Sequence, residues 1–102
     1  MEIQDKVVVV TGGASGIGRE LCRLFAAEGA RQVVVADLNE EGAAVVAEEI
    51  GHTSHQVDVG RENDLVGLIH QTEDAFGPID LFCSNAGIAD GRGIDEPDEV
   101  WD

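Results

Sequence analysis

The chain of 102 residues contains no tyrosine, one lysine and only two cysteines. Without tyrosine, these residues supply no phenol for proton transfer. Cys22 and Cys83 lie far apart in the sequence, which excludes a disulfide framework and a Cys-x-x-Cys metal site. Apolar runs such as Val7–Val10 fall far short of the roughly 20 residues that span a membrane. The first six residues do not have the basic-then-apolar order of a secretory signal, so we expect a cytoplasmic protein.

Positive charge is scarce, because six lysine and arginine residues face 21 acidic ones and the net charge is −15. A surface this acidic repels phosphate backbones and anionic lipids, so we expect neither nucleic acid nor membrane as a partner. The acidity is explained equally by a solubilising surface, by adaptation to high salt or by further chain that carries balancing positive charge. Composition does not separate these three explanations.

Hydrophobic periodicity divides the chain into alternating strands and helices. Strands are predicted at residues 6–11, 32–36, 54–59 and 79–84, the first two of them buried, and the last of the helices between them at residues 65–76. The first helix is predicted from an apolar stripe closed by Gly29, and its members are Ile17, Leu21, Leu24 and Phe25. Asn39 and Gly51 are the expected N-cap and stop of a second helix over residues 40–50. This alternation predicts an α/β fold with a parallel sheet and one domain.

A glycine-rich turn joins the first strand to the first helix and reads Thr-Gly-Gly-Ala-Ser-Gly-Ile-Gly over residues 11–18. Glycine lets a backbone turn tightly and lets a phosphate approach it closely. The helix that follows directs free N–H groups and a partial positive charge outward, which makes an anion site. The alternative is a tight turn that binds nothing, but the strand–turn–helix context favours phosphate binding.

The spacing T-G-x-x-x-G-x-G resembles that of the short-chain dehydrogenase/reductase family. Three later segments agree with that family in order: Asp37 ends the second strand, Asp58-Val59 ends the third, and Asn85-Ala86-Gly87 follows the fourth. The resemblance covers essentially the whole chain. It implies a Rossmann-like, doubly wound parallel sheet of which residues 1–102 form the N-terminal part, with its first four strands in the order 3-2-1-4.

The resemblance implies NAD as the cofactor. A carboxylate at Asp37, 19 residues after Gly18, is placed to accept hydrogen bonds from the adenosine ribose and would repel the extra phosphate of NADP. Ser15 and Leu38 stand where NADP-preferring members of the family often carry a basic residue. A capping or turn aspartate is the alternative interpretation of Asp37. The expected cofactor-binding residues are Gly12, Ser15, Gly16, Ile17, Gly18, Asp37, Leu38, Asp58, Val59, Asn85, Ala86 and Gly87.

Within that set, the family assigns distinct roles. Asp58 resembles the aspartate that hydrogen-bonds the adenine amino group, with the backbone N–H of Val59 beside it; a solvated carboxylate is the alternative. Residues 85–87 resemble the segment that lines the cofactor near its nicotinamide ribose, although Ser84 stands where the family usually has a further asparagine. Thr11 is expected to hydrogen-bond this segment.

No catalytic residue can be placed in this sequence. The family uses a serine, a tyrosine and a lysine four residues after the tyrosine, and the only lysine here, Lys6, precedes the glycine-rich turn. Residues 95–101 carry a strong helix-start signal that includes Pro97 and Trp101. We therefore expect the front part of a longer oxidoreductase, inactive alone, which acts when whole on a secondary alcohol or ketone. The resemblance also implies a homo-oligomer. The alternatives are a non-catalytic nucleotide-binding module, an inactive fragment, and a scaffold that binds no ligand.

Metal binding is not expected. His52 and His55 are separated by two residues but have no third ligand nearby in sequence, whereas zinc sites use three or four protein ligands. His70 lies beside the apolar stripe of the third helix, and a surface position is the expected interpretation for all three. Cys22 and Cys83 are interpreted as small buried hydrophobic residues.

Overall fold

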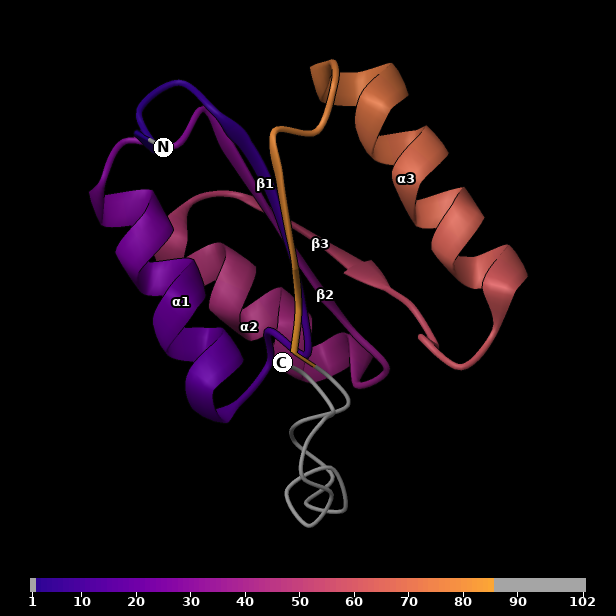
Figure 1. The fold of residues 1–102 in the computed structure, drawn as a ribbon. Helices are drawn as coiled ribbons and strands as arrows, with labels where there is room; N and C mark the ends of the chain where they lie inside the picture. Colours follow the sequence, from indigo (N-terminus) through magenta and orange to yellow (C-terminus); the bar gives the residue numbers. More distant parts are fainter. Residues whose placement is uncertain (1, 86–102) are drawn as a thin grey trace, which may run out of the picture.

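The computed structural model describes residues 2–85 as a four-stranded parallel sheet between two layers of helices (Figure 1). The elements are β1 (Val7–Thr11), α1 (Gly16–Ala27), β2 (Gln32–Asp37), α2 (Glu40–Ile50), β3 (Thr53–Gln56), α3 (Glu62–Phe76) and β4 (Leu81–Ser84). The strand order is β3-β2-β1-β4, which confirms the order predicted from the sequence. In this part of the chain, no helix is long and apolar enough to cross a membrane.

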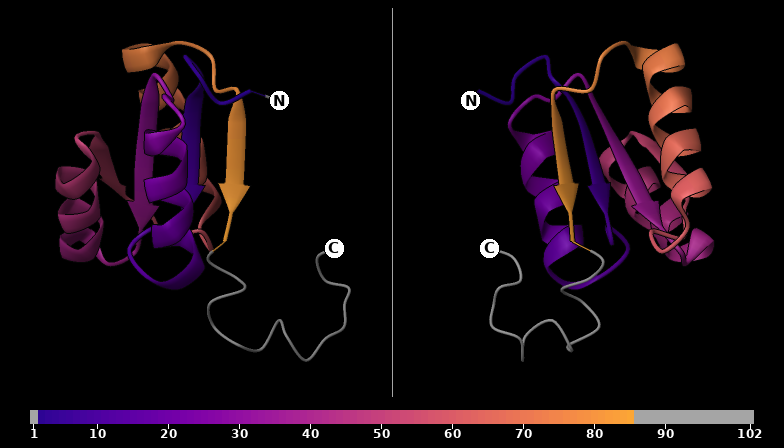
Figure 2. Two further views of the ribbon diagram at one scale, coloured as in Figure 1. Left: turned by 90° about the vertical axis from the view of Figure 1, so that its left-hand side faces the viewer. Right: turned by 45° about the vertical axis from the view of Figure 1, so that its right-hand side comes forward.

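The two central strands supply the core. All of β1 is buried, and alternate residues face opposite sides of the sheet. Val8 and Val10 pack on the face covered by α1 and α2, whereas Val9 packs with Leu68 of α3 on the other face. Figure 1 shows these layers edge-on, with α1 and α2 on one side of the strands and α3 on the other, and the left view of Figure 2 looks onto the sheet from the side of α1. A strand buried on both faces explains why its sequence is a continuous β-branched run.

The ends of α2 follow the predicted signals. The side chain of Asn39 accepts a hydrogen bond from the backbone N–H of Gly42 at 3.0 Å, which caps the first turn. Gly51 ends the helix at a φ of 78°, in the left-handed region that favours glycine. Both residues therefore have the roles that the sequence predicts for them.

Two predicted boundaries were wrong by three residues. The third strand was expected to reach Val59 but ends at Gln56, because Asp58 forms a local turn in which its carboxylate accepts the N–H of Gly60 at 2.9 Å. The third helix begins at Glu62, three residues earlier than expected. Its first turn is polar, so the apolar periodicity that predicted the helix could not detect it.

The predicted apolar stripe of α1 was also partly wrong. Ile17 and Leu24 are 63% and 51% exposed, whereas Cys22 and Phe25 lie in the core. The buried face of α1 runs through Gly18, Cys22 and Phe25. Periodicity alone places a stripe of the correct spacing but does not fix its rotation about the helix axis.

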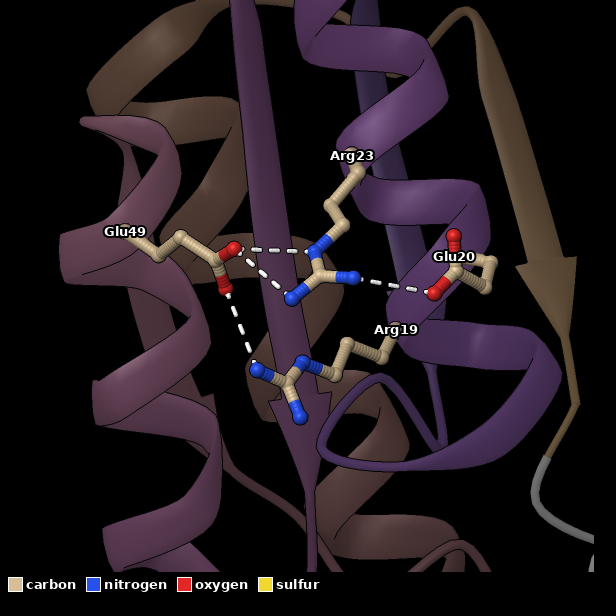
Figure 3. A network of polar contacts seen from close by, with 4 residues as sticks. All are labelled: Arg19, Glu20, Arg23 and Glu49. Carbon is tan, nitrogen blue, oxygen red and sulfur yellow. Dashed lines mark hydrogen bonds and ion pairs between the residues drawn. The ribbon is translucent and has the colours of Figure 1, made fainter.

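An ion-pair network joins α1 to α2 (Figure 3). The carboxylate of Glu49 accepts a hydrogen bond from Nε of Arg23 at 2.9 Å and pairs with Nη2 of the same arginine at 2.8 Å. Its other oxygen lies 3.5 Å from Nη2 of Arg19. Arg23 also contacts Glu20 at 3.0 Å. The two arginines and Glu49 are about 40% exposed, so the network contributes at most about 1 kcal/mol per pair. Its main consequence is that two of the few cations are already engaged by carboxylates.

Candidate functional site

The structure explains why several positions in the turn between β1 and α1 must be glycine. Gly12 and Gly16 adopt φ values of 71° and 58°, a region that residues with a side chain rarely enter. A Cβ on Gly18 would lie 2.0 Å from the carbonyl oxygen of Gly12. A Cβ on Gly13, which the sequence analysis did not single out, would lie 2.9 Å from Val35. The turn can therefore fold tightly against the sheet only with glycine at these positions.

The first turn of α1 carries a positive partial charge and contains no acidic residue of its own. Ser15 is its N-cap, but the serine side chain makes no capping hydrogen bond, and the first turn holds no acidic residue. By contrast, the first turns of α2 and α3 contain acidic pairs, Glu40 with Glu41 and Glu62 with Asp64. Acidic residues near a helix N-terminus normally stabilise the helix, because their negative charge interacts favourably with the helix dipole. In a chain this rich in carboxylates, the N-terminus of α1 is left open to an anion.

A pocket of about 290 Å³ lies at the carboxyl ends of the strands, beside this helix terminus. Six predicted site residues line it, together with Val57, which was not predicted from the sequence. The lining residues are Gly12, Ser15, Asp37, Leu38, Val57, Asp58 and Val59. The volume is near the lower end of the range typical of small-molecule sites. Residues from three loops, far apart in sequence, thus meet at one edge of the sheet.

Three predicted residues of the turn lie elsewhere. Gly16 and Ile17 line a separate, open depression on the outer side of α1, together with Leu24. Gly18 is buried beneath the turn, where its missing Cβ makes room for Gly12. These positions shape the first turn of the helix rather than the wall of the pocket.

Asp37 joins the end of β2 to the glycine-rich turn. One oxygen of its carboxylate accepts the backbone N–H of Ala14 at 3.0 Å, and the other accepts that of Asn39 at 2.9 Å. The turn role considered for this residue is therefore present. Each carboxylate oxygen has capacity for a second hydrogen bond, and the half-buried side chain lines the pocket.

Asp58 and Val59 follow β3 and face the same pocket. The carboxylate of Asp58 accepts the N–H of Gly60, and its backbone N–H donates to the carboxylate of Asp64 at 3.0 Å. Val57 donates its N–H to the carbonyl of Asp37 at 3.0 Å, which holds this loop against the end of β2. The two acidic side chains that line the pocket are thus supported by backbone hydrogen bonds.

The segment after β4 is tied to β1. The backbone N–H of buried Asn85 donates to the hydroxyl of Thr11 at 3.1 Å, which confirms the predicted hydrogen bond. That hydroxyl donates in turn to the carbonyl of Cys83 at 3.4 Å. Ala86 and Gly87 were also predicted at the site, but they lie outside the described residues, as does the helix-start signal at residues 95–101.

The remaining candidates do not gather into a reactive site. Burial, with a smaller effect of nearby Cys83, raises the pKa of Cys22 to about 12, and burial also raises the pKa of Cys83. Both thiols are free. Burial lowers the pKa of His52 below its ordinary value, and His70 is exposed. Among residues 2–85, no group of three or more His, Cys, Asp or Glu side chains is arranged to hold a metal ion.

Comparison with known proteins places the chain in a family. A sequence model described as short chain dehydrogenase matches residues 6–102. A (+)-cis,trans-nepetalactol synthase from Nepeta racemosa is 45% identical over 89 residues, which cover 85% of this chain and 33% of that protein. The chain spans about a third or less of the length of this relative and of two other curated relatives, which are 42% and 43% identical to it.

Solved structures share the fold. A structure titled ribose-5-phosphate isomerase, from Brucella melitensis 16M, superimposes with a TM-score of 0.77 at 32% identity and covers 81% of this chain and 32% of that chain. A hydroxysteroid dehydrogenase from Escherichia coli gives a TM-score of 0.74 at 30% identity, with 81% of this chain and 37% of that chain covered.

Proposed function

The chain belongs to the short chain dehydrogenase family, and on that premise we propose that its pocket binds the adenosine diphosphate part of NAD(H). The whole protein would transfer a hydride between NAD and a secondary alcohol or ketone. The observation that carries the proposal is the open N-terminus of α1. It has no acidic residue and no side-chain cap, and it adjoins the pocket of about 290 Å³.

The pyrophosphate would bind at the first turn of α1. Backbone N–H groups there have no partner within the helix, and the helix dipole favours negative charge. Gly12 and Ser15 line the pocket on this side, and glycine at position 12 exposes backbone to a phosphate. Gly16, Ile17 and Gly18 would contribute by shaping the turn.

The ribose would bind at Asp37, which selects NAD over NADP. Its carboxylate oxygens can accept further hydrogen bonds from ribose hydroxyls, and their charge would repel an added phosphate. None of the residues that line the pocket is basic, so this wall offers no cation to hold the extra phosphate of NADP. Both features support NAD as the cofactor.

The adenine would bind between Leu38 and the loop after β3. Leu38 is 63% exposed although it is a large apolar residue, and a stacked base would cover it. Asp58 would accept a hydrogen bond from the adenine amino group, with the N–H of Val59 beside it. By family resemblance, Asn85, Ala86 and Gly87 would line the cofactor towards its nicotinamide ribose.

The chemistry divides between cofactor and protein. When bound, NAD supplies a nicotinamide ring that accepts or gives a hydride, while protein groups bind and orient it. The residues of this sequence would supply only the binding part, because the sequence contains no tyrosine and its lysine precedes the turn. We therefore place proton transfer and substrate recognition outside these 102 residues.

Calorimetric titration of the purified protein with NAD, NADP and ADP tests the proposal. We expect NAD and ADP to bind and NADP to bind at least about ten-fold more weakly than NAD, a difference near 1.4 kcal/mol. Formation of NADH is then followed with a panel of secondary alcohols. If no dinucleotide binds, the proposal fails. Binding without any hydride transfer, tested on the full-length protein, would support the non-catalytic nucleotide-binding module instead.

A further inference from the structure

The first turn of α2 touches the glycine-rich turn, although the sequence gives no sign of the contact. Gly42, in that first turn, lies against Ala14: a Cβ built on Gly42 would be 3.1 Å from the Cβ of Ala14. The same added atom would be 2.6 Å from Nδ2 of Asn39. Real Cβ atoms essentially never lie within 3.0 Å of another atom, and a contact of 3.1 Å is tighter than most, so a side chain at position 42 would displace the amide of Asn39 and press Ala14 back by a few tenths of an ångström.

Hydrogen bonds extend this contact into a continuous support. Asp37 accepts the N–H groups of Ala14 and Asn39, and the side chain of Asn39 accepts the N–H of Gly42. The Ala14 backbone is thus held by a carboxylate whose position is tied, through Asn39, to the start of α2. We call Asp37, Asn39 and Gly42 the loop seat.

Gly42 has no backbone reason to be glycine. Its φ is not positive, unlike those of Gly12 and Gly16, and glycine within a helix is unfavourable relative to alanine. Gly67, within α3, has nothing within 4 Å of its added Cβ apart from its chain neighbours and the backbone of its own helix, so it is a glycine without this crowding. The unfavourable residue at position 42 is explained by the space that Asn39 and Ala14 occupy beside it.

We propose that the loop seat positions the glycine-rich turn for phosphate binding, and that Gly42 is a positioning residue that acts through Ala14. This inference rests on the proposed function for the identity of the ligand. Anion binding by backbone N–H groups depends on their directions, and small displacements of a supporting shell weaken such sites. Gly42 does not line the pocket, so its effect on binding must pass through the turn.

Two matched variants, Gly42→Ala and Gly67→Ala, test the proposal in the purified protein. Calorimetry gives the affinity for ADP and for adenosine, and thermal unfolding gives stability. We expect Gly42→Ala to weaken ADP binding by about ten-fold or more, the size of effect that overpacking produces. Adenosine lacks the phosphates, so its affinity should change far less. Gly67→Ala should leave both affinities unchanged. Equal ADP affinities in the two variants would overturn the proposal.

A double variant tests the route. Ala14→Gly in the Gly42→Ala background removes the methyl group that the new side chain meets, and we expect it to restore ADP affinity. A double variant as weak as Gly42→Ala alone would overturn the assignment to Ala14. Restoration cannot be explained by a general loss of helix stability, because glycine at position 14 does not strengthen α2.

Amide hydrogen exchange in the wild-type protein gives a measurement that does not depend on any variant folding or on nucleotide. If the loop seat and the Ala14 backbone that it holds open together, the N–H groups of Ala14 and Gly42 should be protected to a similar degree, measured as the slowing of exchange relative to an unstructured peptide. Protection of Ala14 far weaker than that of Gly42 would overturn the proposal. Wild-type protein that shows matched protection but binds no ADP would refute the proposed function and leave the structural coupling intact.

Discussion

The backbone N–H of Asn85 donates to the hydroxyl of Thr11 at 3.1 Å, and the two residues are 74 positions apart in the sequence. The same hydroxyl donates to the carbonyl of Cys83, so one buried side chain satisfies a donor and an acceptor of the neighbouring strand end. A Cβ on Gly18 would lie 2.8 Å from Nδ2 of Asn85. The end of β4 is therefore fixed directly beneath the glycine-rich turn.

Replacing Thr11 by valine should destabilise the fold. Valine keeps the shape but leaves the N–H of Asn85 buried without its partner, which costs about 1–3 kcal/mol. Urea denaturation measures the change in the free energy of unfolding. Thr53→Val is the matched control, because Thr53 is exposed and its hydroxyl bonds only Gln32 at the surface. Surface changes of this kind stay within about 0.5 kcal/mol. Equal losses in the two variants would contradict the structural role of Thr11.

A carboxylate added to the first turn of α1 should have opposite effects on stability and on binding. Ile17 is exposed, so Ile17→Glu disturbs no core contact and should stabilise the helix by about 0.3–1 kcal/mol through the dipole. The same charge should weaken ADP binding by about ten-fold or more, since it competes for the anion site. Thermal unfolding and calorimetry measure the two effects.

Leu24→Glu is the control for that experiment. Leu24 is also exposed on α1 but lies near the end of the helix, away from the open N-terminus. It adds the same charge to the protein and should leave ADP affinity close to the wild-type value. If both variants lose affinity equally, the effect comes from net charge, and the N-terminus of α1 is not the phosphate site.

The sequence predicted the order of the strands because buried parallel strands and capped helices leave local signals. The β-branched runs at Val7–Val10 and in β2, and the caps Asn39 and Gly51, depend on neighbours in the sequence alone. The rotation of α1 could not be predicted, because it depends on which residues the sheet covers. The exposure of Ile17 reflects that tertiary choice.

The candidate site was predictable only in part, for a similar physical reason. Motif spacing identified Asp37 and Asp58, because the first ends β2 and the second lies in the short loop after β3. Val57 went unnoticed because an apolar residue at a strand end looks like core in sequence, yet it also lines the pocket. The contact of Gly42 with Ala14 joins two different turns, and only the folded structure brings them together.

Alkaline pH should destabilise the protein through Cys22. Burial raises the pKa of this thiol to about 12 from an ordinary value of 9.0. Below pH 9.0 the thiol is protonated in both the folded and the unfolded state, so its contribution to stability is fully present. Between pH 9.0 and about 12, the unfolded chain loses the proton while the folded protein keeps it, so the free energy of unfolding falls as pH rises.

Urea denaturation at about pH 8 and about pH 10 measures this loss. Cys22→Ala removes the titrating group, and although the smaller side chain lowers stability at both values, the decrease between them should be smaller than in the wild type. Cys83, whose pKa is also raised by burial, leaves a residual decrease in the variant. A pH dependence identical in the two proteins would show that Cys22 does not contribute. The raised pKa also predicts slow alkylation of Cys22 at neutral pH in the folded protein.

Replacing Asp37 should not convert a preference for NAD into a preference for NADP. Its carboxylate supports the glycine-rich turn as well as lining the pocket. Asp37→Ala removes the repulsion of an added phosphate but also leaves the N–H groups of Ala14 and Asn39 without their acceptor. We expect NAD affinity to fall by about ten- to hundred-fold, the range for hydrogen bonds to a charged group. Calorimetry should show that NADP does not reach the affinity of wild-type protein for NAD.

Asp37→Asn keeps one acceptor oxygen and removes the charge, so it should lose less NAD affinity and discriminate less between the two cofactors. Asp74→Asn, an equal change of charge on exposed α3, is the control and should alter neither affinity. An Asp37→Ala protein that binds NADP as tightly as the wild type binds NAD would show that the turn keeps its position without this carboxylate.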